Sequence, residues 1–399
     1  MRKLMFYCQH ILGMGHLVRS MEIIRGLTEE FEVCFINGGE VVEGFKIPPD
    51  VQVVNLPAIK TDSEFKELQL VDTTQSLEEV QEYRKLKLLK VFEQFQPDCL
   101  MIELFPFGRR RFAFELIPLL EKVKANKGNT KVVCSLRDIV VTKQDQARHE
   151  EKVCKLMNKY FDMLLIHGDP QFQKLEESFS RVNDLNCEVH YTGYVVQKAD
   201  DASNNIHEID VEKPYILVSV GGGRFGHDLL ECVIKSATFL EKRIPHQILM
   251  FTGPFIPHEK YTQFQALANG CTNIKIHRYH PNFLKYMEFA DLSISMAGYN
   301  TTMNILTTQV RAMILPFTGN DDQEQTVRAQ KLKELGIVEV IHPSELIPEI
   351  FAEKIIRYLK YQPKRIKFDV EGVLKTSKYI HKIVKTTDNR NRKNQKVMI

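Results

Sequence analysis

The chain has 399 residues, of which 43% are hydrophobic and 26% charged, and its formal net charge is +3. This length exceeds what one hydrophobic core supports, so two domains are expected, and the charge is too small to indicate nucleic acid as a partner. No apolar run reaches the ~18 residues of a membrane helix, and the eight cysteines form no C-x-x-C pair, which argues against zinc and for reduced thiols in the cytoplasm.

The first half alternates short apolar runs with amphipathic stretches. The opening apolar run stops at Gln9-His10, too early for a signal peptide, so a buried first strand is expected. Short apolar runs are typical of parallel strands buried on both faces, and they occupy Leu4–Cys8, Val33–Ile36, Val51–Leu56, Cys99–Ile102, Val132–Ser135, Met163–Ile166 and Val189–Tyr191. Helices are predicted at Leu77–Phe95 and Phe112–Lys124, so residues 1–196 read as a doubly wound α/β domain.

A second α/β domain is predicted over residues 214–360, after a polar linker at 197–213 that has no periodicity. Its predicted strands are Tyr215–Val220, Gln247–Thr252, Ile274–His277, Leu292–Ser295, Ala312–Pro316 and Val338–Ile341. A C-terminal helix is expected over 361–385, and the basic, polar tail 386–399 has little to bury and is expected to be disordered.

The first candidate motif, Gly13-Met14-Gly15-His16-Leu17-Val18-Arg19, follows the first strand and opens a helix. It lacks the third glycine of a dinucleotide-binding loop, which disfavours an NAD enzyme. A histidine at a helix N-terminus has a lowered pKa and stays neutral, so His16 is a candidate general base. The alternative is that His16 only caps or packs the turn.

Two motifs in the second half also follow strands. Gly221-Gly222-Gly223-Arg224 places free N–H groups at a helix start, where they can hold a diphosphate, with charge added by Arg224. The segments 295–302 and 321–329 add small residues at another helix start and a group of Asp, Gln and Glu side chains suited to sugar hydroxyls. A tight turn and solvated loop residues are the alternatives.

The segment Glu103-Leu104-Phe105-Pro106-Phe107-Gly108-Arg109-Arg110-Arg111-Phe112 follows a strand. Glu103 is a reserve candidate for the base. The arginines with flanking phenylalanines fit a phosphorylated or lipid-linked ligand at a membrane surface, or equally a solvated helix start. Arg137 and Asp138 follow another strand and are expected to pair with each other.

Taken together, the chain resembles GT-B glycosyltransferases, in particular the MurG-like N-acetylglucosaminyltransferases and a poorly characterised bacterial group of predicted glycosyltransferases related to them. The resemblance spans residues 13 to 329 and rests on these segments: Gly13-Met14-Gly15-His16 with Arg19, Phe105-Pro106-Phe107-Gly108-Arg109, Leu136-Arg137-Asp138-Ile139, His167-Gly168-Asp169-Pro170, Thr192-Gly193-Tyr194, Gly221-Gly222-Gly223, Thr252-Gly253-Pro254, Gly298-Tyr299-Asn300-Thr301, and Glu324-Gln325 with Arg328-Ala329.

The resemblance implies two Rossmann-like domains around a central cleft, with the acceptor on residues 1–196 and a nucleotide-sugar donor on 214–360. It places the donor diphosphate at Gly221 to Gly223, the nucleobase at Tyr279 and His280, the α-phosphate at Gly298, Tyr299, Asn300 and Thr301, and sugar hydroxyls at Glu324 and Gln325. On the acceptor side it places Gly13, Gly15, Arg19 and Arg109, with His16 in the loop of the proposed base. Asn304 departs from the family, which has a glutamate there to hold the ribose diol, and an amide binds a diol without charge assistance.

The resulting hypothesis is a metal-independent, inverting transfer of a sugar, with UDP as the expected carrier by resemblance. His16 would deprotonate an acceptor hydroxyl or amine while helix N-termini stabilise the departing diphosphate. The acceptor is left open, with a phosphorylated or lipid-linked molecule and peripheral membrane contact as one alternative. Two other functions stay open: a nucleotide-sugar hydrolase or epimerase, and a catalytically weak nucleotide-sugar-binding partner protein, which Asn304 motivates.

Overall fold

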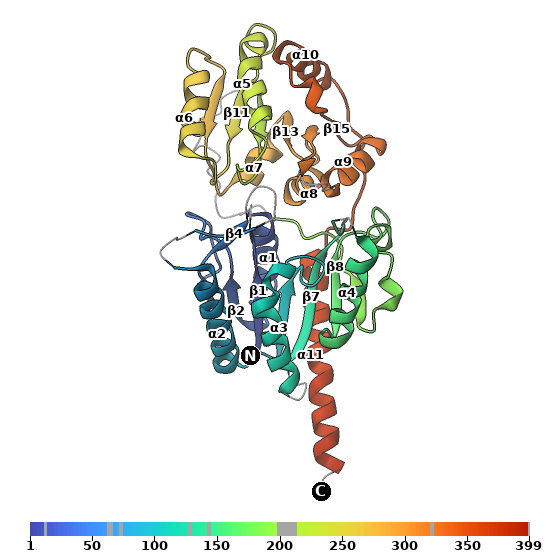
Figure 1. Cartoon of the computed structure of the whole chain (residues 1–399). Coiled ribbons are helices and arrows are strands. Elements are labelled where there is room, and N and C mark those ends of the chain that lie inside the picture. Colours follow the sequence, from blue (N-terminus) through green and yellow to red (C-terminus); the bar gives the residue numbers. More distant parts are fainter. Residues whose placement is uncertain are drawn as a thin grey trace.

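The computed structural model describes residues 1–11, 14–61, 67–71, 75–126, 130–141, 145–197, 214–319 and 323–397, with side chains as far as residue 385. The chain forms two α/β domains, which lie one above the other in Figure 1. The predicted linker therefore lies outside the described residues except for Gln197.

The first domain is built on a seven-stranded parallel sheet of order β3-β2-β1-β6-β7-β8-β9. Its strands are β1 Arg2–Cys8, β2 Phe31–Asn37, β3 Val51–Asn55, β6 Cys99–Glu103, β7 Lys131–Arg137, β8 Met163–His167 and β9 Glu188–Tyr191. Each apolar run predicted for this half is a strand of this sheet. The small antiparallel pair of β4 (Ile59–Thr61) and β5 (Leu68–Leu70) was not predicted, because three residues are too few to show periodicity.

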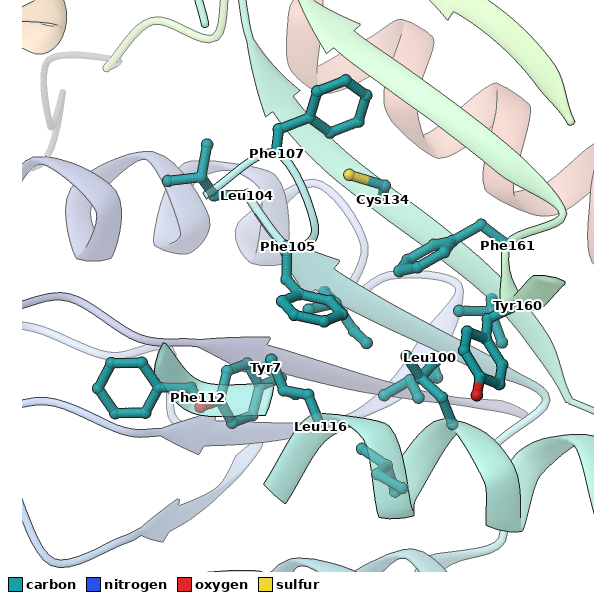
Figure 2. Close-up of a cluster of buried hydrophobic side chains, with 14 of the residues drawn as sticks. Tyr7, Leu100, Leu104, Phe105, Phe107, Phe112, Leu116, Cys134, Tyr160 and Phe161 are labelled. Atoms are coloured by element: carbon teal, nitrogen blue, oxygen red, sulfur yellow. The ribbon is translucent and has the colours of Figure 1, made fainter. Parts of the chain in front are cut away.

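Helices cover both faces of this sheet, as a strand buried on both sides requires. Successive residues of β1 alternate between two cores: Met5 and Tyr7 pack with α2, α3 and α4, whereas Leu4 and Phe6 pack with α1 and α11. Figure 2 shows part of the first core. These helices are α1 Gly15–Arg25, α2 Leu77–Phe95, α3 Ala113–Ala125, α4 Gln146–Tyr160 and α11 Gly372–Val397.

Arg84 of α2 is a buried charged residue that holds together the loops after three strands by hydrogen bonds. Its guanidinium is fully buried and bonds both oxygens of the buried Glu115 carboxylate at 2.8 and 2.6 Å. It also donates to the carbonyls of Gly38 and Pro57 at 2.9 and 2.6 Å, and to the side-chain oxygen of Gln9 at 2.7 Å. These partners follow β1, β2 and β3, so one side chain ties three loops at the carboxyl edge of the sheet.

The second domain has a six-stranded parallel sheet of order β12-β11-β10-β13-β14-β15. Every strand predicted for this half is present, as β10 Tyr215–Ser219, β11 Gln247–Phe251, β12 Ile274–His277, β13 Leu292–Met296, β14 Ala312–Leu315 and β15 Glu339–Val340. Its helices are α5 His227–Glu241, α6 His258–Leu267, α7 Phe283–Glu288, α8 Tyr299–Thr308, α9 Glu324–Glu334 and α10 Pro348–Tyr358. One face packs against α5, α6 and α10, and the other against α7, α8 and α9.

The last helix, α11, returns to the first domain, where it lies alongside the sheet in Figure 1. Its residues Ile380, Ile383 and Val384 are buried in the core that contains α1. The helix starts at Gly372, later than the predicted residue 361, and its backbone continues to Val397. The expectation for the tail at 386–399 stays a prediction.

The carboxyl edges of the two sheets face each other. Residues at or after the strand ends of the first domain contact residues in the amino-terminal halves of helices in the second: Gly15 meets Asn300, His167 meets Tyr299, and Asp138 meets Arg328. In each sheet the strand order reverses once, between β1 and β6 and between β10 and β13. Open α/β sheets bind ligands at such switch points, so these two places define where a site is expected.

Candidate active site at the domain interface

A histidine and a carboxylate meet at the switch point of the first domain. His16 lies in the first turn of α1, just after β1, and Glu103 is the last residue of the neighbouring strand β6. The His16 Nδ1 atom lies 2.7 Å from Glu103 Oε1, and Arg19, one turn later on α1, donates to the same oxygen. The carboxylate is fully buried, whereas the His16 side chain is 14% exposed.

Burial determines the protonation of this pair. Burial, the largest cause, and the charges of Arg109 and Arg137 together bring the pKa of His16 to about 3, while Glu103 opposes the shift. Burial acts to raise the pKa of Glu103, but His16, Arg19 and Arg109 outweigh it and bring that pKa to about 2. At neutral pH the carboxylate is ionised and the imidazole is neutral, with its Nδ1 proton donated to Glu103. No described residue bonds His16 Nε2, which is left to accept a proton.

The predicted role of Glu103 as a reserve base does not fit this geometry, because a fully buried carboxylate cannot reach an acceptor. Its place is behind His16, where it fixes the tautomer and orientation of the imidazole and can stabilise the imidazolium that forms on proton transfer. The pairing joins residues 87 positions apart, which the adjacency of β1 and β6 alone brings together.

Two glycines mark the switch point of the second domain. Gly221 follows β10 and Gly298 follows β13, and the two strands are neighbours in register, with Ser219 opposite Ser295. A side chain at either glycine would meet nothing within 4 Å, so both backbones border open space. Gly298 is the N-cap of α8, whose first N–H groups point there.

The other residues of this loop, Gly222 to Arg224, have a structural role. A side-chain carbon at Gly223 would lie 2.4 Å from the Thr252 carbonyl oxygen, so this residue must be glycine for two loops to pack. Gly222 accepts a bond from the Phe255 N–H at 2.9 Å in the same contact. Arg224, predicted to add charge for a diphosphate, instead donates to Glu40 of the first domain.

The residues after Gly298 contact the first domain or the connecting segment. Tyr299 is only 6% exposed and donates its hydroxyl to the His167 carbonyl at 2.9 Å, and Asn300 donates to the Gly15 carbonyl at 2.9 Å. Thr301 is half-buried. Asn304, expected at the ribose, is buried and its amide donates to Gln197 at 3.1 Å. In this structure neither Tyr299 nor Asn304 presents its side chain to open space.

Glu324 and Gln325 of α9, the pair expected to bind the sugar, also make hydrogen bonds within the protein. Glu324 is buried, and its two oxygens bond Arg328 and Arg137, each at 2.8 Å. Gln325 accepts a bond from the Phe317 N–H at 3.0 Å and remains half-buried.

The predicted Arg137–Asp138 pair is wrong. Arg137 bonds Glu324, while Asp138 accepts from Arg328 Nη2 at 2.7 Å, so each residue crosses the interface. Neighbouring residues in extended chain point to opposite sides, which is why adjacency misled. Arg328 was not predicted to act in the site, although its spacing of four from Glu324 on one helix is a signal for that pair.

The remaining predicted residues lie around this interface. Tyr279 and His280 follow the edge strand β12; the His280 ring packs edge-on to Tyr286, with centroids 5.0 Å apart, and burial raises the pKa of the half-buried Tyr279. Gly15 is exposed beside Asn300, and Gly13 lies outside the described residues.

The arginine segment departs from its prediction in one respect. Arg109 donates through Nε to the Gln9 carbonyl at 2.7 Å, and among the described residues none bonds its two terminal nitrogens. The flanking Phe105, Phe107 and Phe112 are buried in the core of Figure 2, so they are not the membrane-facing groups that were considered.

Metal-binding clusters and membrane-spanning helices are two features that the described residues lack. They contain no cluster of three or more His, Cys, Asp or Glu side chains arranged to hold a metal ion. None of their helices combines the length and apolar character needed to cross a bilayer.

Comparison with known proteins gives this geometry a family context. Residues 216–382 match the Glycosyltransferase family 28 C-terminal domain. An uncharacterized glycosyltransferase of Methanosarcina acetivorans is 23% identical over 370 residues, covering 89% of this chain and 90% of the relative. A UDP-N-acetylglucosamine–N-acetylmuramyl-(pentapeptide) pyrophosphoryl-undecaprenol N-acetylglucosamine transferase of Thermotoga neapolitana is 25% identical, over 47% of this chain and 51% of the relative.

A solved structure supports the same fold. The chain is similar to MurG of Acinetobacter baumannii with a TM-score of 0.53 and 14% identity, over 96% of this chain and 99% of that one. The Methanosarcina relative is archaeal, so the predicted restriction to a bacterial group is not confirmed. The chain therefore has the GT-B fold and is a glycosyltransferase, similar to MurG-like enzymes, that transfers a sugar from a nucleotide-sugar donor.

Proposed function

We propose that the chain transfers the sugar of a UDP-sugar to an acceptor hydroxyl or amine in one inverting displacement, with His16 as the general base. The observation that carries this proposal is the His16–Glu103 pair: a neutral imidazole, oriented by a buried carboxylate, with Nε2 free. The acceptor O–H or N–H proton passes to Nε2, the acceptor atom bonds the anomeric carbon, and the bond to the diphosphate oxygen breaks.

The donor diphosphate is proposed to lie between Gly221 and Gly298. Both glycines border open space at the switch point, and the N-terminus of α8 offers N–H groups and a positive dipole end for the negative charge that develops on the leaving group. UDP as the carrier is supported by the name of the Thermotoga relative, which uses UDP-N-acetylglucosamine.

Ligand binding tests the donor site directly. A UDP-sugar at ~100 times its dissociation constant is expected to stabilise the folded chain by ~2.7 kcal/mol, read as a melting shift against a panel of nucleotides. Gly298→Ala should abolish that shift, because a methyl group would fill the proposed phosphate position. Gly298 has φ −64° and ψ 153°, which alanine adopts freely, so the unliganded melting temperature should not change. An equal shift in the variant and the unmodified chain would refute this position for the diphosphate.

The acceptor is proposed to carry an anionic group, such as a phosphate, that binds Arg109. This guanidinium lies close enough to His16 to lower its pKa, and its terminal nitrogens have no described partner. Guanidinium groups bind phosphate in bidentate geometry. The pyrophosphoryl-undecaprenol acceptor in the name of the Thermotoga relative has this chemistry. The free cysteines, most of them buried, support a reducing compartment such as the cytoplasm.

Transfer is proposed to need no metal ion, because backbone N–H groups and the α8 dipole supply the positive charge at the diphosphate. We expect a chelator such as EDTA to change the transfer rate by less than about twofold, a difference of only about 0.4 kcal/mol in the barrier. The measurement is product formation with and without the chelator. A loss of activity that is restored by a divalent cation would contradict this expectation.

A further inference from the structure

A continuous series of contacts joins the proposed base to the second domain. Glu103 bonds both His16 and Arg19, and the Arg19 guanidinium lies over the ring of Tyr299, with its central carbon 5.2 Å from the ring centroid. Tyr299 is the first residue of α8, so this contact crosses from one domain to the other. The hydroxyl of the same tyrosine donates to the carbonyl of His167.

The series continues from Tyr299 to the donor side. The Arg328 guanidinium also lies over this ring, at 5.4 Å from its centroid. Arg328 in turn bonds Asp138 of the first domain at 2.7 Å and Glu324 of its own helix at 2.8 Å. Glu324 is the residue expected at the sugar hydroxyls, so the contacts run from the base to the predicted sugar-binding carboxylate.

Burial makes this arrangement stiff. The side chains of Arg19 and Arg328 are 2% and 0% exposed. Two guanidinium groups repel each other, but an aromatic ring attracts both through its face, and the attraction grows when water is excluded. The ring of Tyr299 therefore fixes the spacing between a cation that holds Glu103 and a cation that holds Glu324.

His167, the backbone partner of Tyr299, is itself fixed. Its buried ring bonds Ser135 at 2.8 Å through Nε2 and Thr192 at 2.9 Å through Nδ1. Tyr299 thus docks on a rigid part of the first domain. It also directly follows Gly298, where the donor phosphate is proposed to bind.

We propose that Tyr299 is a positioning residue that sets the distance between the base on the first domain and the donor sugar on the second. This inference rests on the proposed function, since it takes His16 as the base and Gly298 as part of the donor site. Small displacements of reacting groups slow catalysis strongly. Loss of the ring should therefore reduce kcat far more than it changes the donor KM.

The test compares variants of Tyr299 with matched variants of Tyr215. Tyr215 is a buried tyrosine of the same core, and its hydroxyl also donates to a backbone carbonyl, that of Tyr286 at 2.6 Å, but it lies at the amino end of β10. Tyr299→Met is expected to lower kcat about 100-fold, with the donor KM little changed. Tyr215→Met is expected to lower the melting temperature and leave kcat near that of the unmodified enzyme.

Tyr299→Phe keeps the ring and removes the hydroxyl, with its bond to the His167 carbonyl and its backbone hydrogen bond with Val195 of the same domain. We expect kcat to fall by about tenfold at most, and the ratio of donor hydrolysis to transfer to rise, because the domain contact excludes water less well. Tyr215→Phe should leave that ratio unchanged. If Tyr299→Met does not fold, this ratio decides the question.

The proposal would be overturned by equal losses of kcat in the Tyr299 and Tyr215 variants, or by an unchanged ratio in Tyr299→Phe. Failure of the underlying function gives different results. Full transfer activity in His16→Ala would refute His16 as the base. The absence of a melting shift with a UDP-sugar in the unmodified chain would refute the donor site.

Discussion

We expect the replacement of His16 by alanine to lower kcat for sugar transfer by about 10²- to 10⁴-fold, the usual contribution of a general base. The reason is that no other described group combines a neutral nitrogen, partial exposure and a buried carboxylate behind it. Donor binding, measured by the melting shift with a UDP-sugar, should be unchanged, because His16 belongs to the opposite domain. The assay is single-turnover transfer at saturating donor.

A matched control is His258→Ala. This histidine also starts a helix, α6, but it is exposed, and the one ring hydrogen bond it makes with a described residue joins it to Arg278 of its own domain. Its loss should leave kcat unchanged. A comparable fall in both variants, or full activity of His16→Ala, would show that His16 is not the base.

The pH profile follows from the same pair. The folded-state pKa of His16 is about 3, below the usual 6.5, so the imidazole stays neutral well below neutral pH, and kcat/KM should not fall near pH 6.5 through His16. The free energy of unfolding also falls with pH. Because protonation of His16 favours the unfolded chain, the contribution of His16 to stability is lost as pH falls from about 6.5 toward 3. Glu103, with its pKa lowered from 4.5 to about 2, loses its contribution between those values. An acidic limb near pH 6.5 that disappears in the His16 variant would contradict this environment.

The largest expected effect on stability is that of Arg84→Met. The change removes the ion-pair partner of the buried Glu115 carboxyl group and frees the oxygens of Gly38, Pro57 and Gln9. Removing one member of a buried ion pair typically costs about 3–5 kcal/mol. The measurement is the midpoint of urea unfolding followed by a signal from the first domain.

Two comparisons make this result specific. Lys235→Met breaks an exposed pair with Glu231 on α5 and should cost about 0.5 kcal/mol or less. Arg84→Met combined with Glu115→Leu removes both charges and should recover part of the loss, because a buried pair can be replaced by apolar groups at little net cost. Equal unfolding midpoints for Arg84→Met and Lys235→Met would show that the buried interactions of Arg84 do not stabilise the first domain.

Much of the fold could be predicted from the sequence because buried parallel strands leave a plain signal. Runs such as Cys99–Ile102 and Leu292–Ser295 are apolar on both faces, and glycine loops follow several of them. The helix predicted over residues 77–95 has these bounds in the structure, where Ser76 caps its start and Glu79 completes the capping box. Local chemistry and periodicity were sufficient for these elements.

The site was only partly accessible to the same reasoning. His16 and Glu103 could each be selected because they follow strands, but their pairing depends on the order of the strands in the sheet. Tyr299 and Glu324 looked like ligand-binding residues because they stand beside glycine or in polar loops. Their actual partners, His167 and Arg137, belong to the other domain, and such partners leave no mark in local sequence.

The path of α11 has a consequence for how the protein is made. Ile380, Ile383 and Val384 fill the core that also holds Leu4 and Met21, so the first domain to leave the ribosome lacks one of its covering helices until nearly 200 further residues have been added after Gln197. During that interval the apolar face of the sheet that carries α1 is only half covered. This exposed face can bind a chaperone or associate with another copy of the chain. Synthesis that stops after the second domain would leave both sheets formed and this face bare, so a truncation near residue 371 is expected to yield aggregated protein.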